Sequence, residues 1–311
     1  MGIVKRPATT DRSGIAELLN IPVLLPKADV LRKERVDVAF VVDTLFEAGA
    51  GIGWASAEDA HRGFSLTRAL KMAEVRNFGL PADNELDRLA SFQAKLGQVL
   101  TAGAIPIAVH ADQLGSVAAI RSFAGRFDKP GAVIFALDPV GQCDFEISVA
   151  DTIVDAVEAG FNPENCVVVG LSGWCRPLSG FERMKALGVH TISLEEIWSD
   201  SMVDLHSRIA TVAGRGSDAV FLSFDMRRAS ETSTEYGVTA RDLFRLIQKL
   251  SRIPIRGVDV CLSQDNAKAS PGFALPLVFE TLSQVATREG KSRRRTPRDG
   301  AAPDTRRMKS P

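Results

Sequence analysis

Residues 104–116 read AIPIAVHADQLGS. An apolar run typical of a buried strand ends abruptly in His110, Asp112 and Gln113, and a further element begins at Gly115. Apolar residues without polar alternation are typical of a strand that is covered on both faces, as in a parallel sheet. In open parallel sheets, ligands bind beyond the carboxyl ends of the strands. This stretch therefore predicts a parallel α/β fold with a candidate site directly after the strand.

The same pattern recurs along the chain. Apolar runs alternate with helical patterns about eight times, and no long linker interrupts the alternation between Val36 and Val285. The apolar runs are residues 36–42, 104–109, 131–137, 166–171, 190–194, 218–224 and 254–260, with a weaker run at 74–80. The pattern predicts a single α/β domain over residues 1–289, a three-layer αβα sandwich with a mostly parallel sheet of about eight strands.

Two of the intervening segments carry clear helix-boundary signals. The helical pattern of residues 84–103 ends at Gly103, and glycine commonly terminates helices. Thr239 and Asp242 resemble a capping box, with Asp in the usual Glu position, just before the apolar residues LFRLI.

The charge of the chain is unevenly distributed. Net charge is zero over 311 residues, but residues 290–311 hold eight Lys or Arg and two Asp. This segment therefore carries +6 and leaves −6 on the rest. It has no apolar periodicity, so we expect a disordered basic tail rather than a nucleic-acid or membrane anchor.

Cysteine usage and hydropathy indicate the cellular setting. None of the four cysteines forms a CxxC pair, and Cys166 and Cys261 lie within apolar runs, as small core residues do. The chain has no apolar stretch of about 18 residues and no signal-peptide pattern at its start. We expect a cytoplasmic protein with no membrane segment.

Acidic residues also follow other predicted strands. Asp138 comes directly after residues 131–137, and Asp225 comes directly after residues 218–224. Because the carboxyl ends of parallel strands share one edge of the sheet, these carboxylates should converge with the cluster that starts at His110. Several buried like charges are costly unless a cation joins them. The sequence therefore predicts a charged pocket.

The order of these segments resembles the ureohydrolase family, which includes arginase, agmatinase and formimidoylglutamase. The resemblance covers roughly residues 13–288. The segments that carry it are HRGFSLTRALK, GAIPIAVHADQLGS, AVIFALDPVGQCDF, DAVFLSFDMRR, YGVTARDLFRLI and IRGVDVCLS, after an opening segment that contains VDVAFVVDTLFEAG. The resemblance implies an arginase-like fold and a site for two Mn²⁺ ions, held by two His and four Asp, that share a hydroxide.

Matched position by position, this chain keeps only two of those six ligands, Asp138 and Asp225. The other matched positions are Gln113 for the first His, Val140 and Gln142 in the second motif, Arg227 in the third, and a position near Ala150 for a His downstream of the second motif. Two family Glu positions correspond to Asp242 and Leu262. Amides bind Mn²⁺ weakly and valine cannot bind it, so we expect no metal cofactor.

Arg227 is the most informative of these replacements. Its guanidinium is permanently charged, and beside Asp138 and Asp225 it would supply the positive charge of the missing ions. We therefore expect a non-catalytic arginase-like or agmatinase-like homologue that acts as a partner or regulatory subunit, or as a small-molecule binder. The resemblance implies a homo-oligomer, trimer or hexamer, or a hetero-oligomer with an active relative.

Alternatives remain open from the sequence. The protein could be an active hydrolase of linear amidines or guanidino compounds, with manganese at a single altered site formed by Asp138, Asp225 and His110. It could also catalyse metal-free chemistry with Asp138, Asp225 and Arg227. Asp138 and Asp225 could instead only bind loop amides. The glycine-rich stretch GAGIG at residues 49–53 could bind a phosphate, although it lacks the GxGxxG spacing.

Overall fold

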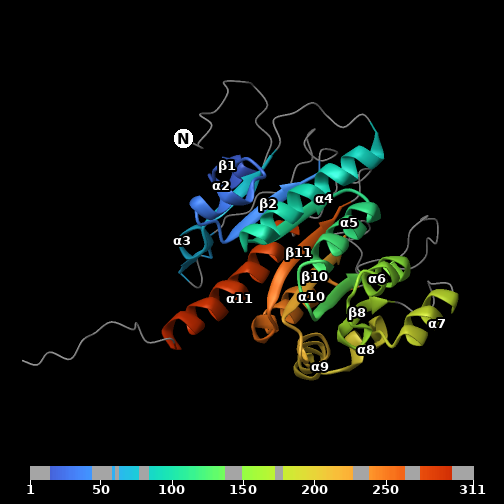
Figure 1. The fold of residues 1–311 in the computed structure, drawn as a ribbon. Coiled ribbons are helices and arrows are strands. Elements are labelled where there is room, and N and C mark those ends of the chain that lie inside the picture. Colours follow the sequence, from blue (N-terminus) through green and yellow to red (C-terminus); the bar gives the residue numbers. More distant parts are fainter. Residues whose placement is uncertain are drawn as a thin grey trace, which may run out of the picture.

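A nine-stranded parallel sheet forms the centre of the molecule in the computed structural model (Figure 1). The structure describes residues 15–43, 58–59, 63–76, 84–136, 149–171, 178–226, 238–262 and 274–295. In spatial order the strands are β1 (Val23–Leu24), β5 (Met72–Val75), β2 (Val38–Val42), β6 (Ile105–His110), β11 (Ile255–Cys261), β10 (Ala219–Asp225), β7 (Pro130–Ala136), β8 (Cys166–Leu171) and β9 (His190–Ser193). Every neighbouring pair is parallel. The predicted parallel α/β fold is confirmed, with nine strands in place of about eight.

Helices cover both faces of the sheet, which gives the predicted three layers (Figure 1). On one face pack α2 (Ala28–Lys33), α4 (Glu85–Ala102), α5 (Gln113–Ala124), α6 (Val149–Glu158) and α7 (Leu178–Leu187). On the other pack α1 (Ile15–Leu19), α3 (Leu66–Ala69), α8 (Leu194–Ser199), α9 (Met202–Gly214), α10 (Ala240–Ile247) and α11 (Ala274–Arg295). A separate antiparallel pair joins β3 (Glu58–Asp59) and β4 (Phe64–Ser65).

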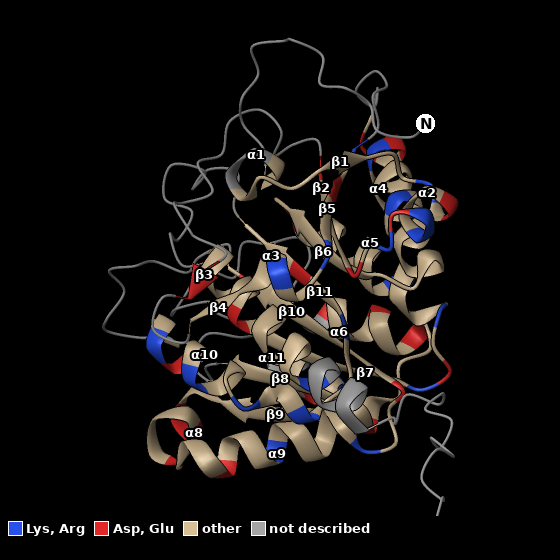
Figure 2. Ribbon diagram, turned by 90° about the vertical axis from the view of Figure 1, so that its left-hand side faces the viewer, with Lys and Arg blue, Asp and Glu red and all other residues tan. Residues whose placement is uncertain are grey.

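The central strands are buried along their whole length, as their unbroken apolar runs predict. All five residues of β2 and all seven of β7 are buried. Burying one large aliphatic or aromatic side chain contributes about 1.5–3 kcal/mol, so helices on both faces stabilise such strands. Charged residues belong mostly to the helices, and the strands are largely uncharged (Figure 2). Among the described helices, none is both long and apolar enough to span a membrane.

Helix boundaries follow local chemistry that the sequence displays. The Asn84 side chain accepts a hydrogen bond from the Asp87 amide at the start of α4, and Gly103 ends the helix at φ 84°. Glycine adopts this left-handed conformation without the penalty that a Cβ brings. At α10, Thr239 accepts a bond from the Asp242 amide and donates its hydroxyl to the Asp242 carboxylate at 2.7 Å. Thr239 is therefore the N-cap, as predicted.

Three further sequence predictions compare with the structure as follows. The weak run at 74–80 corresponds to β5, which begins two residues earlier and ends at Val75. The last helix, α11, continues to Arg295, six residues past the predicted boundary at 289, so its end lies inside the segment expected to be disordered. Cys166 and Cys261 are fully buried, and burial raises the pKa of the Cys166 thiol to about 12.

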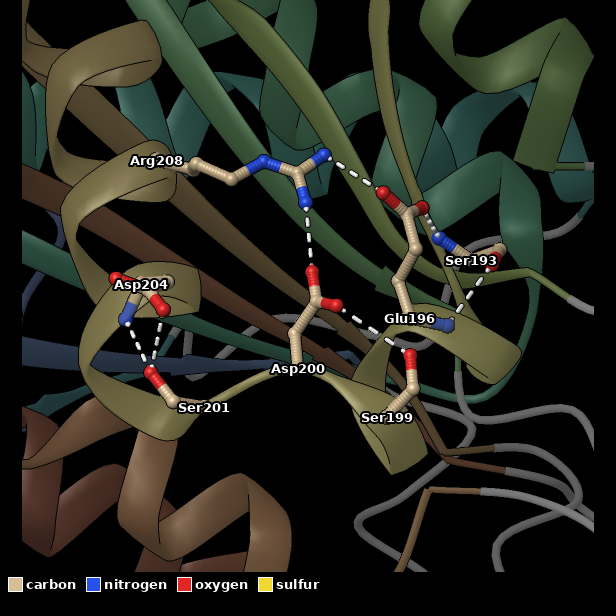
Figure 3. A network of polar contacts seen from close by, with 7 residues as sticks. All are labelled: Ser193, Glu196, Ser199, Asp200, Ser201, Asp204 and Arg208. Carbon is tan, nitrogen blue, oxygen red and sulfur yellow. Dashed lines mark hydrogen bonds and ion pairs between the residues drawn. The ribbon is translucent and has the colours of Figure 1, made fainter.

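A polar network joins β9, α8 and α9 at one end of the sheet (Figure 3). Ser193 and Glu196 form a capping box, in which the Ser193 hydroxyl accepts the Glu196 amide and the Glu196 carboxylate accepts the Ser193 amide at 2.7 Å. Arg208 of α9 then donates to Glu196 at 2.8 Å and to Asp200 at 3.2 Å. The network fixes the angle between two short consecutive helices.

This network predicts a pH-dependent contribution from Glu196. Desolvation by burial raises the pKa of Glu196, but the Ser193 amide and Arg208 outweigh it and hold the pKa below its ordinary value of 4.5. The contribution to stability is therefore present above about pH 4.5 and is lost as pH falls through the lower, folded-state pKa. We expect Glu196→Gln to reduce the unfolding free energy at pH 7 by less than about 1 kcal/mol, because the pair is partly exposed, and the difference from wild type to vanish in acid.

Urea unfolding at pH 7 and at pH 3 measures this difference. Glu195→Gln is the matched control, because Glu195 is an exposed neighbour in the same first turn. Equal pH dependence of the two variants would contradict the assignment.

Candidate functional site at the carboxyl edge of the sheet

Four polar or thiol side chains lie at the carboxyl ends of four neighbouring strands. Asp43 follows β2, and its amide donates to the Val109 carbonyl of β6 at 2.8 Å. His110 ends β6 in register with Cys261 of β11, and Cys261 is in register with Asp225 of β10. All four side chains are at most 5% exposed. The register of a parallel sheet therefore assembles a buried row of Asp, His, Cys and Asp at this edge.

Arg88 of α4 supplies a positive charge to this edge. Its guanidinium pairs with the buried Asp43, with Asp112 at 2.7 Å and with Glu85 at 3.5 Å. Burial lowers the pKa of Arg88, but the charges of Asp43 and Asp112 outweigh burial and raise the pKa above its ordinary value. Arg88 and Asp43 are 7% and 1% exposed, so this pair lies out of water, whereas the Asp112 and Glu85 carboxylates are 30% and 62% exposed.

Sequence reasoning missed Arg88 and Asp43. A signal was present for both: Asp43 directly follows the apolar run 36–42, and Arg88 lies four residues before Phe92 and eight before Leu96, on the apolar face of the helix. A charged residue on the buried face of a helix is rare unless it is paired.

His110 is engaged at both ring nitrogens. Its Nε2 lies 2.9 Å from the Asp259 carboxylate of β11, and its Nδ1 lies 2.8 Å from the Asp112 backbone carbonyl. Both His110 and Asp259 are fully buried. In this structure both ring nitrogens of His110 therefore contact protein oxygens, and the alternative in which His110 holds a displaced metal together with Asp138 stays a prediction.

Asp112 and Gln113 begin helix α5 and are also engaged. Asp112 is the N-cap, with Oδ1 accepting the Gly115 amide at 2.9 Å while Oδ2 pairs with Arg88. Gln113 is buried, and its amide nitrogen donates to the Thr152 hydroxyl of α6 at 2.5 Å. Within the part of the chain that the structure describes, the Gln113 amide oxygen has no hydrogen-bond partner.

The remaining predicted positions divide into described and undescribed residues. Asp225 is buried at the end of β10, and Asp242 partners the N-cap of α10. Asp138, Val140, Gln142 and Arg227 lie outside the described residues, as do the stretch 49–53, Ala150's side chain, Cys143 and Cys175. The expected contact of Arg227 with Asp138 and Asp225 therefore stays a prediction.

Several described side chains at this edge are already engaged by protein groups. Mn²⁺ prefers carboxylate and imidazole donors. Here the imidazole of His110 binds Asp259, the Asp112 carboxylate binds Arg88, and position 113 carries an amide. Within the ranges that the structure describes, no three His, Cys, Asp or Glu side chains are grouped to hold a metal ion.

Comparison with solved structures identifies the same fold in several enzymes. Proclavaminate amidino hydrolase from Streptomyces clavuligerus is 16% identical, with a TM-score of 0.62 over 81% of this chain and 93% of that one. Trypanosoma cruzi formiminoglutamase with Mn²⁺ is 17% identical, with a TM-score of 0.61 over 85% and 99%. Formimidoylglutamase from Bacillus subtilis is 11% identical, with a TM-score of 0.64 over 91% and 96%.

At these identities the structural similarity shows a shared fold and nothing about activity. No curated protein matches the sequence. The sequence profile described as "Arginase family" matches residues 27–264, which is well over half of the chain. Both the strand order and this match agree with the resemblance drawn from the motifs, and the chain belongs to the arginase family.

Proposed function

We propose that this protein is a non-catalytic member of the arginase family that acts as a partner or regulatory subunit, or as a small-molecule binder. The observation that carries the proposal is the guanidinium of Arg88, paired with Asp43 and Asp112 at the carboxyl edge of the sheet. The Trypanosoma cruzi formiminoglutamase structure contains Mn²⁺. In this chain a protein cation, Arg88, lies beside the carboxylates at the carboxyl edge of the sheet.

Electrostatics supports this proposal. A guanidinium repels a nearby divalent ion, and the repulsion is stronger in a buried site than in water because the effective dielectric constant is lower. Carboxylates favour metal binding only when they are free to coordinate, and Asp112 already uses both oxygens. The sequence adds Val140, which has no donor atom, and Arg227, a second permanent cation, at two matched ligand positions.

An active hydrolase with an altered site is the second candidate. It is favoured by the retention of Asp225, which is buried at the carboxyl end of β10, and of Asp138 in the sequence. Such an enzyme would cleave a C–N bond of a linear amidine or guanidino compound with fewer ligands than its relatives. In either case we propose a cytoplasmic protein that assembles as a homo-oligomer, trimer or hexamer, or with an active relative.

Metal content and activity separate the two candidates. We expect protein purified in the presence of Mn²⁺ to hold far less than one ion per chain and to release no urea from arginine, agmatine or guanidinobutyrate. Elemental analysis and a colorimetric urea assay measure both quantities. About two ions per chain together with urea release would overturn the proposal, and one ion with release would establish the second candidate.

Restoring the matched ligands tests the positional assignment. The quadruple variant Gln113→His, Val140→His, Gln142→Asp and Arg227→Asp should bind Mn²⁺ measurably more tightly than wild type, because it replaces an apolar residue, two amides and a cation by donors. Isothermal titration with MnCl₂ measures this affinity. A folded quadruple variant without any gain in affinity would contradict the matching of these positions to the family ligands.

Loss of Arg88 tests its role as the internal cation. We expect Arg88→Ala to reduce the unfolding free energy by about 3 kcal/mol or more, because it removes the guanidinium from the buried Asp43. Arg121→Ala is the matched control: Arg121 of α5 pairs with Asp155 at 2.6 Å, but its side chain is 54% exposed, so the expected loss is below about 1 kcal/mol. Urea unfolding measures both variants, and similar small losses would show that Arg88 does not compensate the buried charge.

A further inference from the structure

A second buried contact at the same edge joins helix α5 to strand β11. Asp259 of β11 accepts a hydrogen bond from the Ser116 hydroxyl of α5 at 2.8 Å, on the same oxygen that lies 2.9 Å from His110 Nε2. All three residues are fully buried. Ser116 therefore donates to the carboxylate, and the arrangement differs from a nucleophilic Ser–His–Asp relay, in which the imidazole would stand between the other two.

The hydrogen positions in this cluster follow from its partners. A backbone carbonyl only accepts, so the His110 Nδ1 that faces the Asp112 carbonyl carries a hydrogen. One more proton lies between Nε2 and the Asp259 carboxylate, because two bare acceptors 2.9 Å apart would repel. The imidazole thus bridges the β6–α5 turn to β11 through two hydrogen bonds.

The glycine at 115 is required by this imidazole. A Cβ built on Gly115 would lie 2.4 Å from His110 Cγ, 2.6 Å from Nδ1 and 2.7 Å from the His110 Cβ. Phe92 of α4 packs edge-on against the His110 ring, with centroids 5.9 Å apart. A shift of the ring to make room for a side chain at 115 would therefore disturb a ring that is already held by Phe92 and by the contact with Asp259.

We infer that His110 and Gly115 form a mutually dependent pair that clamps the first turn of α5 onto β11 and so positions Asp112 for Arg88. His110 acts through other groups: it holds the Asp112 carbonyl, Asp112 caps α5 through the Gly115 amide, and the second Asp112 oxygen meets the guanidinium. In this chain the segment H-x-D-x-x-G-S, residues 110–116, is one structural unit in which each named residue has a separate task. His110 is a positioning residue, and the inference holds whether or not the protein is catalytic.

Gly257 supports the close approach of α5 to β11. A Cβ on Gly257 would lie 2.9 Å from the rings of Phe123 and Phe221, so the absent side chain leaves room for Phe123 of α5. Helix α5 thus contacts β11 at its start through Asp259 and near its end through Phe123. Of these two contacts, the one with Asp259 fixes the orientation of α5 on β11, because hydrogen bonds are directional and apolar contacts are not.

A double-substitution experiment tests the mutual dependence. Gly115→Ala should lower the midpoint of thermal unfolding by roughly 5 °C or more, because the added methyl group overlaps the imidazole. Gly97→Ala in α4 is the matched control, since nothing lies within 4 Å of a Cβ there, and it should leave the midpoint unchanged or slightly higher. His110→Gly removes the overlap, so Gly115→Ala should cost less in that background than in wild type. Additive losses in the double variant would overturn the inference.

Local readouts distinguish positioning from general packing. In wild type, ¹H–¹⁵N spectra should show a hydrogen on His110 Nδ1 that exchanges slowly with solvent. In His110→Gly, amide hydrogen exchange at residues 115–117 should accelerate about tenfold or more, while exchange in α9 stays unchanged. Rapid exchange of the imidazole hydrogen in wild type would contradict the inference, as would unchanged amide exchange at residues 115–117 in His110→Gly. If His110→Gly does not fold, the inference is tested by the wild-type imidazole spectrum and by the comparison of Gly115→Ala with Gly97→Ala. Neither experiment measures metal content or urea release, so the result is independent of the test of the proposed function.

Discussion

A buried carboxylate needs a cation or hydrogen-bond donors, and this requirement governs the carboxyl edge of the sheet. Parallel strands all end at one edge, so Asp43, Asp225 and Asp259 are collected within four neighbouring strands. The Trypanosoma cruzi formiminoglutamase structure, which has the same fold, contains Mn²⁺. In this chain Arg88 binds Asp43, and His110 with Ser116 binds Asp259. Protein side chains therefore bind the Asp43 carboxylate and one oxygen of Asp259 at this edge.

These contacts also connect the layers of the molecule. Arg88 links α4 to the ends of β2 and β6, while His110 and Ser116 link β6 and α5 to β11. Gln113 links α5 to α6 through Thr152. A region that is held together by several directional contacts tolerates change poorly at any one of them, because removing one partner leaves the other buried and unsatisfied. We infer that rearrangement of this edge into a metal-binding geometry requires several substitutions together.

The candidate site divides into a part that the sequence indicated and a part that it did not. His110, Asp112 and Gln113 lie at the carboxyl end of β6 and the start of α5, because residues directly after a buried parallel strand reach that edge of the sheet. Their role as pocket residues stays a prediction, and their partners were not predicted. Asp259 is 149 residues from His110, and Arg88 is 45 from Asp43, so no local pattern reports these pairs. The interpretation of Arg227 as the compensating cation remains a prediction, while Arg88 has that role among the described residues.

The sequence by itself determined the class of fold, because unbroken apolar runs at regular spacing can be buried only in a sheet with helices on both faces. It also determined local features such as the end of α4 at Gly103 and the N-cap at Thr239, since these depend on residues within one turn. Only the tertiary structure decided which side chain neutralises which carboxylate. That choice depends on strand order and register, which set residues far apart in the chain within 3 Å of one another. Local backbone conformation depends on a few neighbouring residues, whereas the partner of each buried charge depends on the order and register of the strands.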